Sequence, residues 1–386
     1  MNVPIVGAGK GEGLHARCAS QWGRGGSLCH RLRQACGGLG LGQGEAKRCS
    51  GVAKSSFQPA WWLPGAHLQT IWPNFFRPRV RLATRCERLV LPDGDFIELH
   101  WAGRGAGPIV VVLHGLGGSI RSHYASGMLA ALTGRGFRAV LMHLRGAGEE
   151  PNRLPRSYHS GDTADFRHCL QVLRERQPGV PLAAVGYSLG GNVLLKYLGE
   201  EGEEALLAAA VAVSVPFDLG ATVDCLNRGL ARIYQRRLLR CLKWSTRRKL
   251  GRLPLPVDGR GLAGIRTLRE FDERLTAPLN GFRDAEDYYR RSSSRHFLKA
   301  IVVPTLVLHA EDDPFMPPGI VPSASALGPA VRLELSRHGG HAGFVAGPPW
   351  APVYWAEGRA RAFLTAHLGR GSGSSGEGVP RPGTNA

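Results

Sequence analysis

The sequence predicts an α/β fold in which a mostly parallel central sheet is covered by helices on both faces. Short apolar runs alternate along the chain with segments whose apolar residues recur at helical spacing. Most positions within the runs are apolar, which is typical of strands buried on both faces. The chain has 386 residues and is 43% hydrophobic, so it can bury a core of this size. Strands that alternate with helices in this way indicate parallel pairing.

The expected elements follow one another in a regular order. The run 109–113 is apolar and rich in β-branched residues, and it ends in a glycine-rich loop. Residues 162–176 place Phe166, Leu170 and Leu173 on one helix face. The expected strands are 109–113, 138–144, 182–187, 208–215, 305–309 and 331–335, and the expected helices are 122–132, 162–176, 190–198 and 356–367.

A long connection separates two of the strands. Between Val215 and Thr305 lie about ninety residues with helical patterns and no clear core strand. A connection of that length needs structure of its own. We therefore expect residues 217–299 to form a helical cap over the carboxyl ends of the strands.

Both ends of the chain lack an apolar period. Residues 1–56 are rich in glycine and basic residues, and residues 369–386 are a Gly/Ser/Pro tail. Both are expected to be disordered and to flank one domain at 57–368. No run approaches the roughly 18 apolar residues of a membrane span, and no signal-peptide core is visible. The expected location is cytoplasmic, with a position at the membrane periphery as the alternative.

The formal charge of +19 is concentrated in two segments. Residues 1–56 carry eight Lys and Arg against two acids, and residues 228–252 carry ten with no acid. In the second segment, basic and apolar positions predict an amphipathic helix. Its basic side either contacts an anionic membrane or is a solvated outer face of the cap. Nucleic acid is not expected as a partner, because no binding module is visible. The apolar set is Leu226, Leu230, Ile233, Leu238 and Leu242, and the basic set is Arg228, Arg232, Arg236, Arg240 and Lys243.

The sequence Gly186-Tyr187-Ser188-Leu189-Gly190 matches Gly-x-Ser-x-Gly, and no other segment of the chain does. The motif holds a nucleophilic serine on a sharp strand-to-helix turn, where small residues let the backbones approach. Here it follows an apolar strand and opens a helix, as that geometry requires. Ser188 is the candidate nucleophile.

A serine hydroxyl needs a base that an acid orients, and with this motif the order along the chain is serine, acid, histidine. We favour His341, in a glycine-rich loop, as the base, with His338 as the alternative. His367 falls in the closing helix. Asp312 and Asp313 are both candidates for the acid, since both follow the strand that ends near His309. We favour Asp313, which begins an Asp-x-x-x-Pro stretch, and keep Asp312 as the alternative.

Two backbone N–H groups are expected to stabilise the oxyanion. One belongs to Leu189, which follows the nucleophile, and the other to Leu116 in the loop 114–118. Neither a metal nor an organic cofactor is expected. The eight cysteines include no Cys-x-x-Cys pair and no set with zinc-ligand spacing.

With these residues in place, the chain resembles the α/β-hydrolase superfamily and, more narrowly, its YheT-like group of hydrolases. The resemblance covers about residues 57–368. The stretches that carry it are WWLPGAHLQT (61–70), HGLGGS (114–119) with SHY (122–124), LPRSYHSG (154–161), FDE (271–273), DDPF (312–315) and HGGHAGF (338–344).

The resemblance implies a helical-cap α/β-hydrolase fold, an esterase or lipase-like activity, and the triad Ser188, Asp313 and His341. The implied substrates are short- to medium-chain acyl esters or lipid esters. Two alternatives remain: transfer of the acyl group to an alcohol on the same triad, and a non-catalytic binding protein of the same fold. The stretch 154–161 either shapes the acyl pocket or braces the loop after Arg145.

Overall fold

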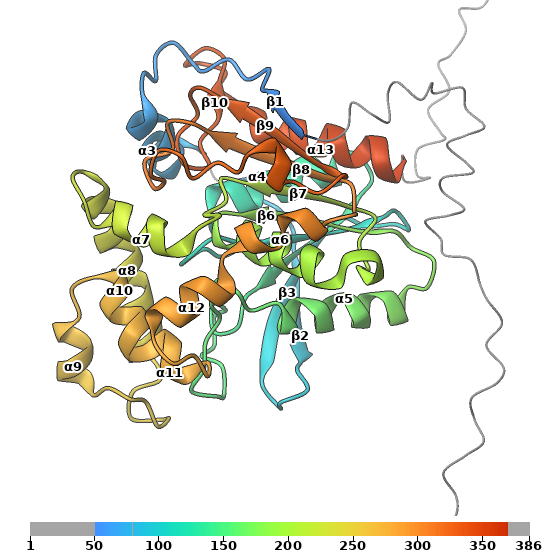
Figure 1. The fold of residues 1–386 in the computed structure, drawn as a ribbon. Helices are drawn as coiled ribbons and strands as arrows, with labels where there is room; N and C mark the ends of the chain where they lie inside the picture. The colour runs from blue at the N-terminus through green and yellow to red at the C-terminus, as the bar shows by residue number, and fades with distance from the viewer. Residues whose placement is uncertain (1–50, 79, 370–386) are drawn as a thin grey trace, which may run out of the picture. The chain divides into compact units, whose positions relative to one another are not determined.

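The computed structural model describes residues 51–78 and 80–369, and it confirms the α/β fold. Nine strands form one sheet in the order β1-β9-β8-β7-β6-β4-β5-β3-β2 (Figure 1). Neighbouring strands are parallel except β2–β3 and β3–β5. The strands are β1 (Gly51–Lys54), β2 (Arg85–Val90), β3 (Phe96–Ala102), β4 (Ile109–Leu113), β5 (Arg138–His143), β6 (Leu182–Tyr187), β7 (Ala209–Val213), β8 (Thr305–Ala310) and β9 (Val331–Ser336).

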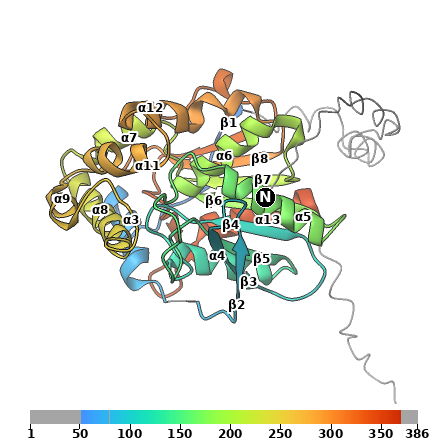
Figure 2. The same cartoon turned by 90° about the horizontal axis from the view of Figure 1, so that it is seen from below.

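Helices cover both faces of this sheet (Figures 1 and 2). One face packs on α5 (Ala164–Arg176) and α6 (Leu189–Glu201), and the other on α4 (His123–Thr133) and α13 (Trp355–Leu368). Side chains alternate between the two cores along each strand: Val111 joins the first, Val110 and Val112 the second. Burial on both faces explains why the central strands read as continuous apolar runs.

The strands and helices expected from the sequence are all present, with ends that shift by a few residues. One expected boundary is wrong. Residues 51–56 are not part of a disordered extension, because Gly51–Lys54 forms β1 and pairs in parallel with β9. A four-residue strand with alternating exposure has little local signal, and only its distant partner stabilises it. Residues 1–50 and 370–386 lie outside the described part of the chain.

Between β7 and β8 every described element is a helix, in the stretch where the sequence predicts a cap. These helices bury apolar side chains of their own, including Leu262, Ile265 and Leu275. The elements are α7 (Leu219–Leu226), α8 (Ala231–Arg247), α9 (Gly259–Gly264), α10 (Leu268–Phe271), the π-helical turn η2 (Asp272–Thr276), α11 (Ala277–Leu279), α12 (Ala285–Ser292), η3 (Ser294–His296) and η4 (Leu298–Ala300).

The basic cap segment differs from the prediction in its apolar face. Leu238 and Leu242 pack against the cap core, but Leu230 and Ile233 are 64% and 59% exposed. The segment is not one helix, since α7 ends at Leu226 and Gly229 adopts a φ of 48° before α8 begins. The turn at Gly229 breaks the helix, so residues before and after it that share one spacing in the sequence do not share one helix face.

The helix α3 (Ala66–Phe76) joins the cap to the main domain. The side-chain amide of Gln69 donates to the carbonyl of Val345 and accepts from its N–H, at 3.1 and 2.8 Å. Val345 begins β10 (Val345–Ala346), which pairs with β11 (Val353–Tyr354). The side chain of His67 hydrogen-bonds the hydroxyl of Tyr234 in α8 at 2.9 Å. None of the described helices is long and apolar enough to cross a membrane.

Candidate active site

Ser188 lies on a sharp turn between β6 and α6, with φ 51° and ψ −118°. Its N–H donates to the carbonyl of Val213 at 2.8 Å, which holds this strained conformation. A Cβ on Gly190 would lie 2.6 Å from the carbonyl oxygen of Leu113, and a Cβ on Gly186 would lie 2.5 Å from that of Gly190. Only glycine at these two positions lets α6 approach the sheet so closely. The local structure is the serine turn that the motif predicts.

The structure brings Ser188, His341 and Asp313 into one hydrogen-bonded chain. His341 Nε2 is 3.0 Å from Ser188 Oγ, and His341 Nδ1 is 2.8 Å from Asp313 Oδ2. The Asp313 side chain is fully buried and the His341 ring nearly so. The three residues follow β6, β9 and β8, whose carboxyl ends meet at one edge of the sheet. An Nδ1–H donated to the carboxylate leaves Nε2 free to accept the serine proton.

The backbone around His341 is held on two sides. Its N–H donates to Thr70 Oγ1 at 2.8 Å, and the N–H of Ala342 donates to Ser214 Oγ at 2.9 Å. Ala342 and Ser214 both have positive φ, at 55° and 53°. Residue-by-residue reasoning did not assign a role to Thr70 or Ser214. The only signal for Thr70 was its place in the resembling stretch 61–70.

The alternative acid and base form a separate pair. His338 Nδ1 is 3.3 Å from Asp312 Oδ2, and the His338 side chain is 57% exposed. Asp312 also accepts from the N–H of Gly340 at 2.9 Å. Asp312 and His338 therefore hydrogen-bond within the loops that follow β8 and β9. His367 lies in α13 and hydrogen-bonds the carbonyl of Phe363. Neither alternative histidine hydrogen-bonds Ser188 in the structure.

Two tyrosines hold the loop that faces the serine. The N–H groups of Gly115 and Gly117 donate to the hydroxyls of Tyr124 and Tyr158, each at 2.9 Å. The residue between them is Leu116. Within the described residues, its N–H has no hydrogen-bond partner. The two phenols therefore occupy the neighbouring donors and leave the predicted oxyanion donor available.

A buried histidine orients the same peptide. His114 Nδ1 donates to the carbonyl of Gly115 at 2.7 Å, and its Nε2 accepts from the N–H of Leu144 at 3.1 Å. Complete burial lowers the pKa of His114 to about 3, so the ring is neutral and this tautomer persists. In a trans peptide the N–H points opposite to the C=O. Fixing the Gly115 carbonyl therefore fixes the direction of the Leu116 N–H.

Leu189, the other predicted donor, is the first residue of α6. N–H groups in the first turn of a helix lack partners within the helix, and the helix dipole favours negative charge beside them. This end of α6 starts directly after Ser188. An oxyanion near Ser188 Oγ could therefore receive hydrogen bonds from two elements.

Two cavities meet at the loop 114–118. One of about 240 Å³ has Ser188 and His341 in its wall, and a larger one of about 760 Å³ lies between the main domain and the cap. Both cavities share Leu116, Leu189 and Cys241 as wall residues. The apolar part of the larger wall comes from Ile120, Leu242, Leu255, Leu268, Phe271, Leu275 and Leu279, among others.

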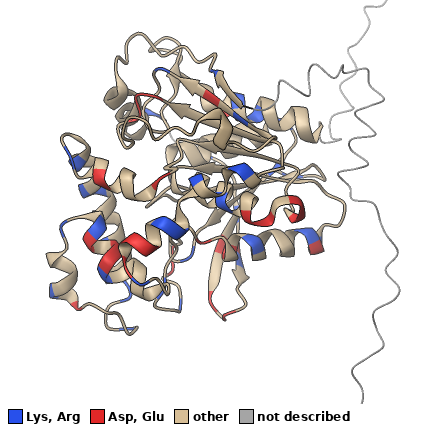
Figure 3. Ribbon diagram, viewed as in Figure 1, with Lys and Arg blue, Asp and Glu red and all other residues tan. Residues whose placement is uncertain are grey.

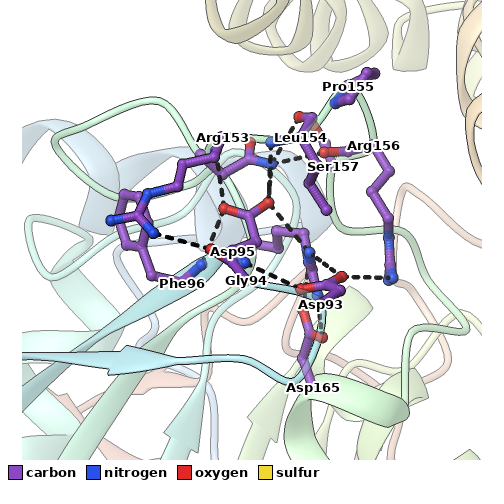
Figure 4. Close-up of polar contacts among 12 residues, drawn as sticks. Asp93, Gly94, Asp95, Phe96, Arg153, Leu154, Pro155, Arg156, Ser157 and Asp165 are labelled. Carbon is purple, nitrogen blue, oxygen red and sulfur yellow. Dashed lines mark hydrogen bonds and ion pairs between the residues drawn. The ribbon is translucent and has the colours of Figure 1, made fainter. Parts of the chain in front are cut away.

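A buried ionic network braces the stretch 154–161 (Figure 4). The Arg145 guanidinium donates to both oxygens of Asp165 at 2.7 and 2.8 Å, and to Asp93 and Asp95 at 2.7 and 3.1 Å. Asp95 also accepts from the Asn152 side chain at 2.7 Å. A buried charge is tolerated only when it is paired and hydrogen-bonded in this way.

The same stretch also forms cavity wall, since Pro155 and residues 157–160 line the larger cavity. Lys249 of the cap donates to Ser157 Oγ at 2.7 Å and to the carbonyl of Arg156 at 2.9 Å. The N–H of Tyr158 donates to the carbonyl of Arg145 at 3.0 Å. The stretch 154–161 therefore braces the loop after Arg145 and also lines a cavity.

One group of possible metal ligands occurs among the described residues. The donor atoms of Cys86, Glu98 and His100 lie within 4.8 Å of one another on β2 and β3. The sequence did not predict this group, because strand pairing brings its members together. It lies at one edge of the sheet, whereas Ser188 follows the central strand β6. The triad chemistry does not use it.

Comparisons with known proteins agree with the fold. Residues 108–348 match a family model described as the alpha/beta hydrolase fold. YheT of Escherichia coli (strain K12), a presumed esterase, is 44% identical over 82% of this chain and 95% of that protein. Phospholipase ABHD3 of Mus musculus is 31% identical over 77% of this chain and 75% of that protein.

Among solved structures, an esterase of Pyrococcus furiosus has a TM-score of 0.50 at 15% identity, and covers 76% of this chain and 99% of that one. A likeness at this identity concerns the fold alone. The match to the family model and the similarity to YheT do not depend on this structural likeness, and each covers most of the folded residues. The chain therefore belongs to the α/β-hydrolase family and, within it, to the YheT-like group.

Proposed function

We propose that this protein hydrolyses carboxylic esters, with Ser188 as nucleophile, His341 as base and Asp313 as the acid that orients it. The observation that carries the proposal is the hydrogen-bonded chain from Ser188 Oγ through His341 to Asp313, at 3.0 and 2.8 Å. The names of the relatives, a phospholipase and a presumed esterase, support an ester as the substrate.

The proposed reaction has two steps on one serine. Ser188 Oγ attacks the ester carbonyl carbon while its proton passes to His341 Nε2. The N–H groups of Leu116 and Leu189 stabilise the tetrahedral oxyanion, which collapses by breaking the C–O bond. His341 returns the proton to the leaving alcohol, and the acyl group remains on Ser188. A water molecule then attacks the acyl-enzyme while its proton passes to His341 Nε2. The ester bond to Ser188 breaks, His341 returns the proton to Ser188 Oγ, and the carboxylic acid product leaves.

The cavities support a substrate with a substantial apolar part. The larger cavity of about 760 Å³ adjoins the oxyanion residues, and apolar cap side chains such as Leu268, Phe271 and Leu275 form part of its wall. A cavity of this size accommodates ligands of drug size or a lipid chain. We therefore include lipid esters with short- to medium-chain acyl esters in the proposed substrate class.

The test is hydrolysis of p-nitrophenyl esters from acetate to long acyl chains by the purified protein and by Ser188→Ala. Loss of activity by about four orders of magnitude or more is expected, because the triad acts as a unit. Unchanged activity in Ser188→Ala would contradict the assignment of the nucleophile. Absence of activity of the wild-type protein on every ester in the series would contradict the proposed function.

A further inference from the structure

Exposed apolar side chains gather on two helices of the described structure. Phe75 and Phe76 at the end of α3 are 70% and 66% exposed, and Leu68 on the same helix is also exposed. Leu230 and Ile233 at the start of α8 are exposed as well, and so is Trp244 further along. Half of the large hydrophobic side chains that the described residues expose belong to this group. Exposed apolar clusters of this kind mark interaction sites more often than single residues do.

The exposed residues of α8 form one stripe. Leu230, Ile233, Arg237, Arg240 and Trp244 follow one another at steps of three or four residues, which places them on one side of the helix. The opposite side of the helix is buried against the cap core. The stripe therefore combines apolar and cationic side chains, and the cap does not cover it.

The basic residues of this helix, coloured blue in Figure 3, form no ion pair within the described residues. None of the eight arginines in the segment 228–252 forms an ion pair there, and the segment contains no acid. Other arginines in the fold are paired, as Arg77 is with Glu357 and Arg359 is with Glu334. Five of the eight lie on α8 or just before it, are exposed, and form no side-chain hydrogen bond in the described structure: Arg228, Arg232, Arg236, Arg240 and Arg247.

Both helices border the cavity that contains Ser188. Figure 2 shows α3 beside α8, and the Arg237 side chain contacts Asn74 Oδ1 at 3.5 Å. Ile71 and Asn74 of α3 form one part of that cavity wall, while Tyr234 and Arg237 of α8 form another. The exposed side chains thus lie on the two helices that border the cavity at Ser188.

We propose that this docking face, formed by Leu68, Phe75, Phe76, Leu230, Ile233, Trp244 and the five arginines, binds an anionic lipid surface. Its apolar side chains enter the boundary between headgroups and acyl chains, and its arginines contact the lipid phosphates. A second copy of the chain is disfavoured as the occupant, because it would oppose two faces of like charge. The proposal rests on the proposed function in one respect: docking presents lipid esters directly to the cavity at Ser188.

The test is co-sedimentation of the full chain with phosphatidylcholine vesicles, with and without phosphatidylglycerol, at low and high NaCl. We expect binding to the anionic vesicles to be at least tenfold tighter, and to weaken as salt shortens the Debye length from about 10 Å at 0.1 M to about 3 Å at 1 M. Equal binding to neutral and anionic vesicles, or no binding to either, would overturn the proposal.

Two double variants locate the surface. Arg232→Gln/Arg236→Gln should weaken binding by about 25-fold, since each basic residue near such a surface contributes roughly fivefold. Phe75→Ser/Ile233→Ser should weaken it by at least about tenfold through the loss of inserted apolar area. None of these four residues lines either cavity.

Matched controls lie before β5 and β8, at the amino edge of the parallel strands and opposite Ser188. Arg135→Gln/Lys299→Gln repeats the charge change there, and Val302→Ser removes a partly exposed apolar side chain. These variants should bind like the wild type. Docking-face variants that bind like the controls would contradict the proposal, as would a dimer in analytical ultracentrifugation that Ile233→Ser converts to monomer.

A soluble short-chain p-nitrophenyl ester separates this proposal from the proposed function. All the docking-face variants should hydrolyse it at the wild-type rate, because the triad and oxyanion residues are untouched. Vesicle binding of Ser188→Ala reports docking without catalysis. Loss of vesicle binding with intact ester hydrolysis in the docking-face variants is therefore the expected pattern. A wild-type protein that binds vesicles but hydrolyses no ester contradicts only the catalytic assignment.

Discussion

The imidazole of His341 lies flat against the ring of Phe315, with centroids 3.8 Å apart and planes within 6° of each other. Phe315 is two residues after Asp313, and its N–H donates to Asp313 Oδ1 at 2.9 Å. One short loop therefore supplies the proposed acid and also covers one face of the proposed base. The imidazole is held in its plane by hydrogen bonds at both nitrogens and across its plane by the stacked ring.

Removing the stacked ring should loosen the base without removing it. We expect Phe315→Ala to lower kcat for p-nitrophenyl butyrate by about tenfold, because small misplacement of a catalytic group is costly. Phe315→Tyr keeps the ring and should restore most of the rate. Steady-state kinetics of both variants checks this. Equal losses in the two variants would show that stacking does not position His341.

The two neighbouring aspartates should differ sharply in their effects. Asp313→Asn should lower kcat by about 10³- to 10⁴-fold, because an amide stabilises neither the imidazolium nor the required tautomer. Asp312→Asn should change kcat by less than about threefold, since Asp312 contacts His338 and Gly340 rather than His341. The kcat values of both variants on one ester decide this. A larger loss in Asp312→Asn would reverse the assignment.

The tyrosines of the oxyanion loop should matter for rate as well as for stability. Tyr158→Phe leaves the N–H of Gly117 without this partner, which should destabilise the fold by about 0.5–1.5 kcal/mol and lower kcat by roughly tenfold. Tyr197→Phe is the matched control, since its hydroxyl accepts from the N–H of Leu206 away from the site. The control should lose stability but not kcat in urea unfolding and kinetic measurements. Parallel kcat losses in the two would refute the positioning role of Tyr158.

Two helical glycines should respond oppositely to alanine. In Gly190→Ala the new methyl group would lie 2.6 Å from the carbonyl oxygen of Leu113, so α6 must move away from the sheet. We expect a loss of at least about 2 kcal/mol of unfolding free energy, together with most of the activity. Gly358→Ala in α13 meets no atom within 4 Å and should stabilise the fold by up to about 1 kcal/mol. Thermal unfolding of the two proteins is the measurement, and a stabilised Gly190→Ala would contradict the close approach.

The cap should carry a pH dependence of stability from Asp272. Burial raises the pKa of this carboxyl from 3.8 to about 6, although Thr276 and Tyr289 both donate hydrogen bonds to it. Between about pH 3.8 and pH 6, the folded chain keeps a proton on Asp272 that the unfolded chain has released. The contribution of this group to the unfolding free energy therefore falls as pH rises. The loss is complete above about pH 6.

Asp272→Asn removes that titration. The difference in unfolding free energy between the wild type and Asp272→Asn should therefore decrease from pH 4 to pH 7, as followed by urea unfolding at several pH values. A difference that stays constant over this range would mean that Asp272 has an ordinary pKa in the folded protein.

Local patterns were sufficient for much of the fold. The central strands and the helices between them were predictable because each buries apolar residues at a fixed period along its own sequence. The serine turn was predictable as well, since Gly186 and Gly190 are required by steric contacts close to Ser188. By contrast, β1 and α3 were missed, because their stability comes from partners far away in the chain. The β2–β3 hairpin was missed as well, although its two strands are neighbours in the chain.

The sequence by itself determined the α/β class, the nucleophile turn and a short choice of acids and bases, because these depend on local spacing and chain order. The tertiary structure places Asp313 and His341, rather than Asp312 and His338, in the hydrogen-bonded chain with Ser188, because both pairs of candidates follow the same strands and only packing separates them. It also brought Thr70, Tyr124 and Tyr158 to the site. Hydrogen bonds between residues distant in sequence leave no period along the chain, so no local pattern could have shown them.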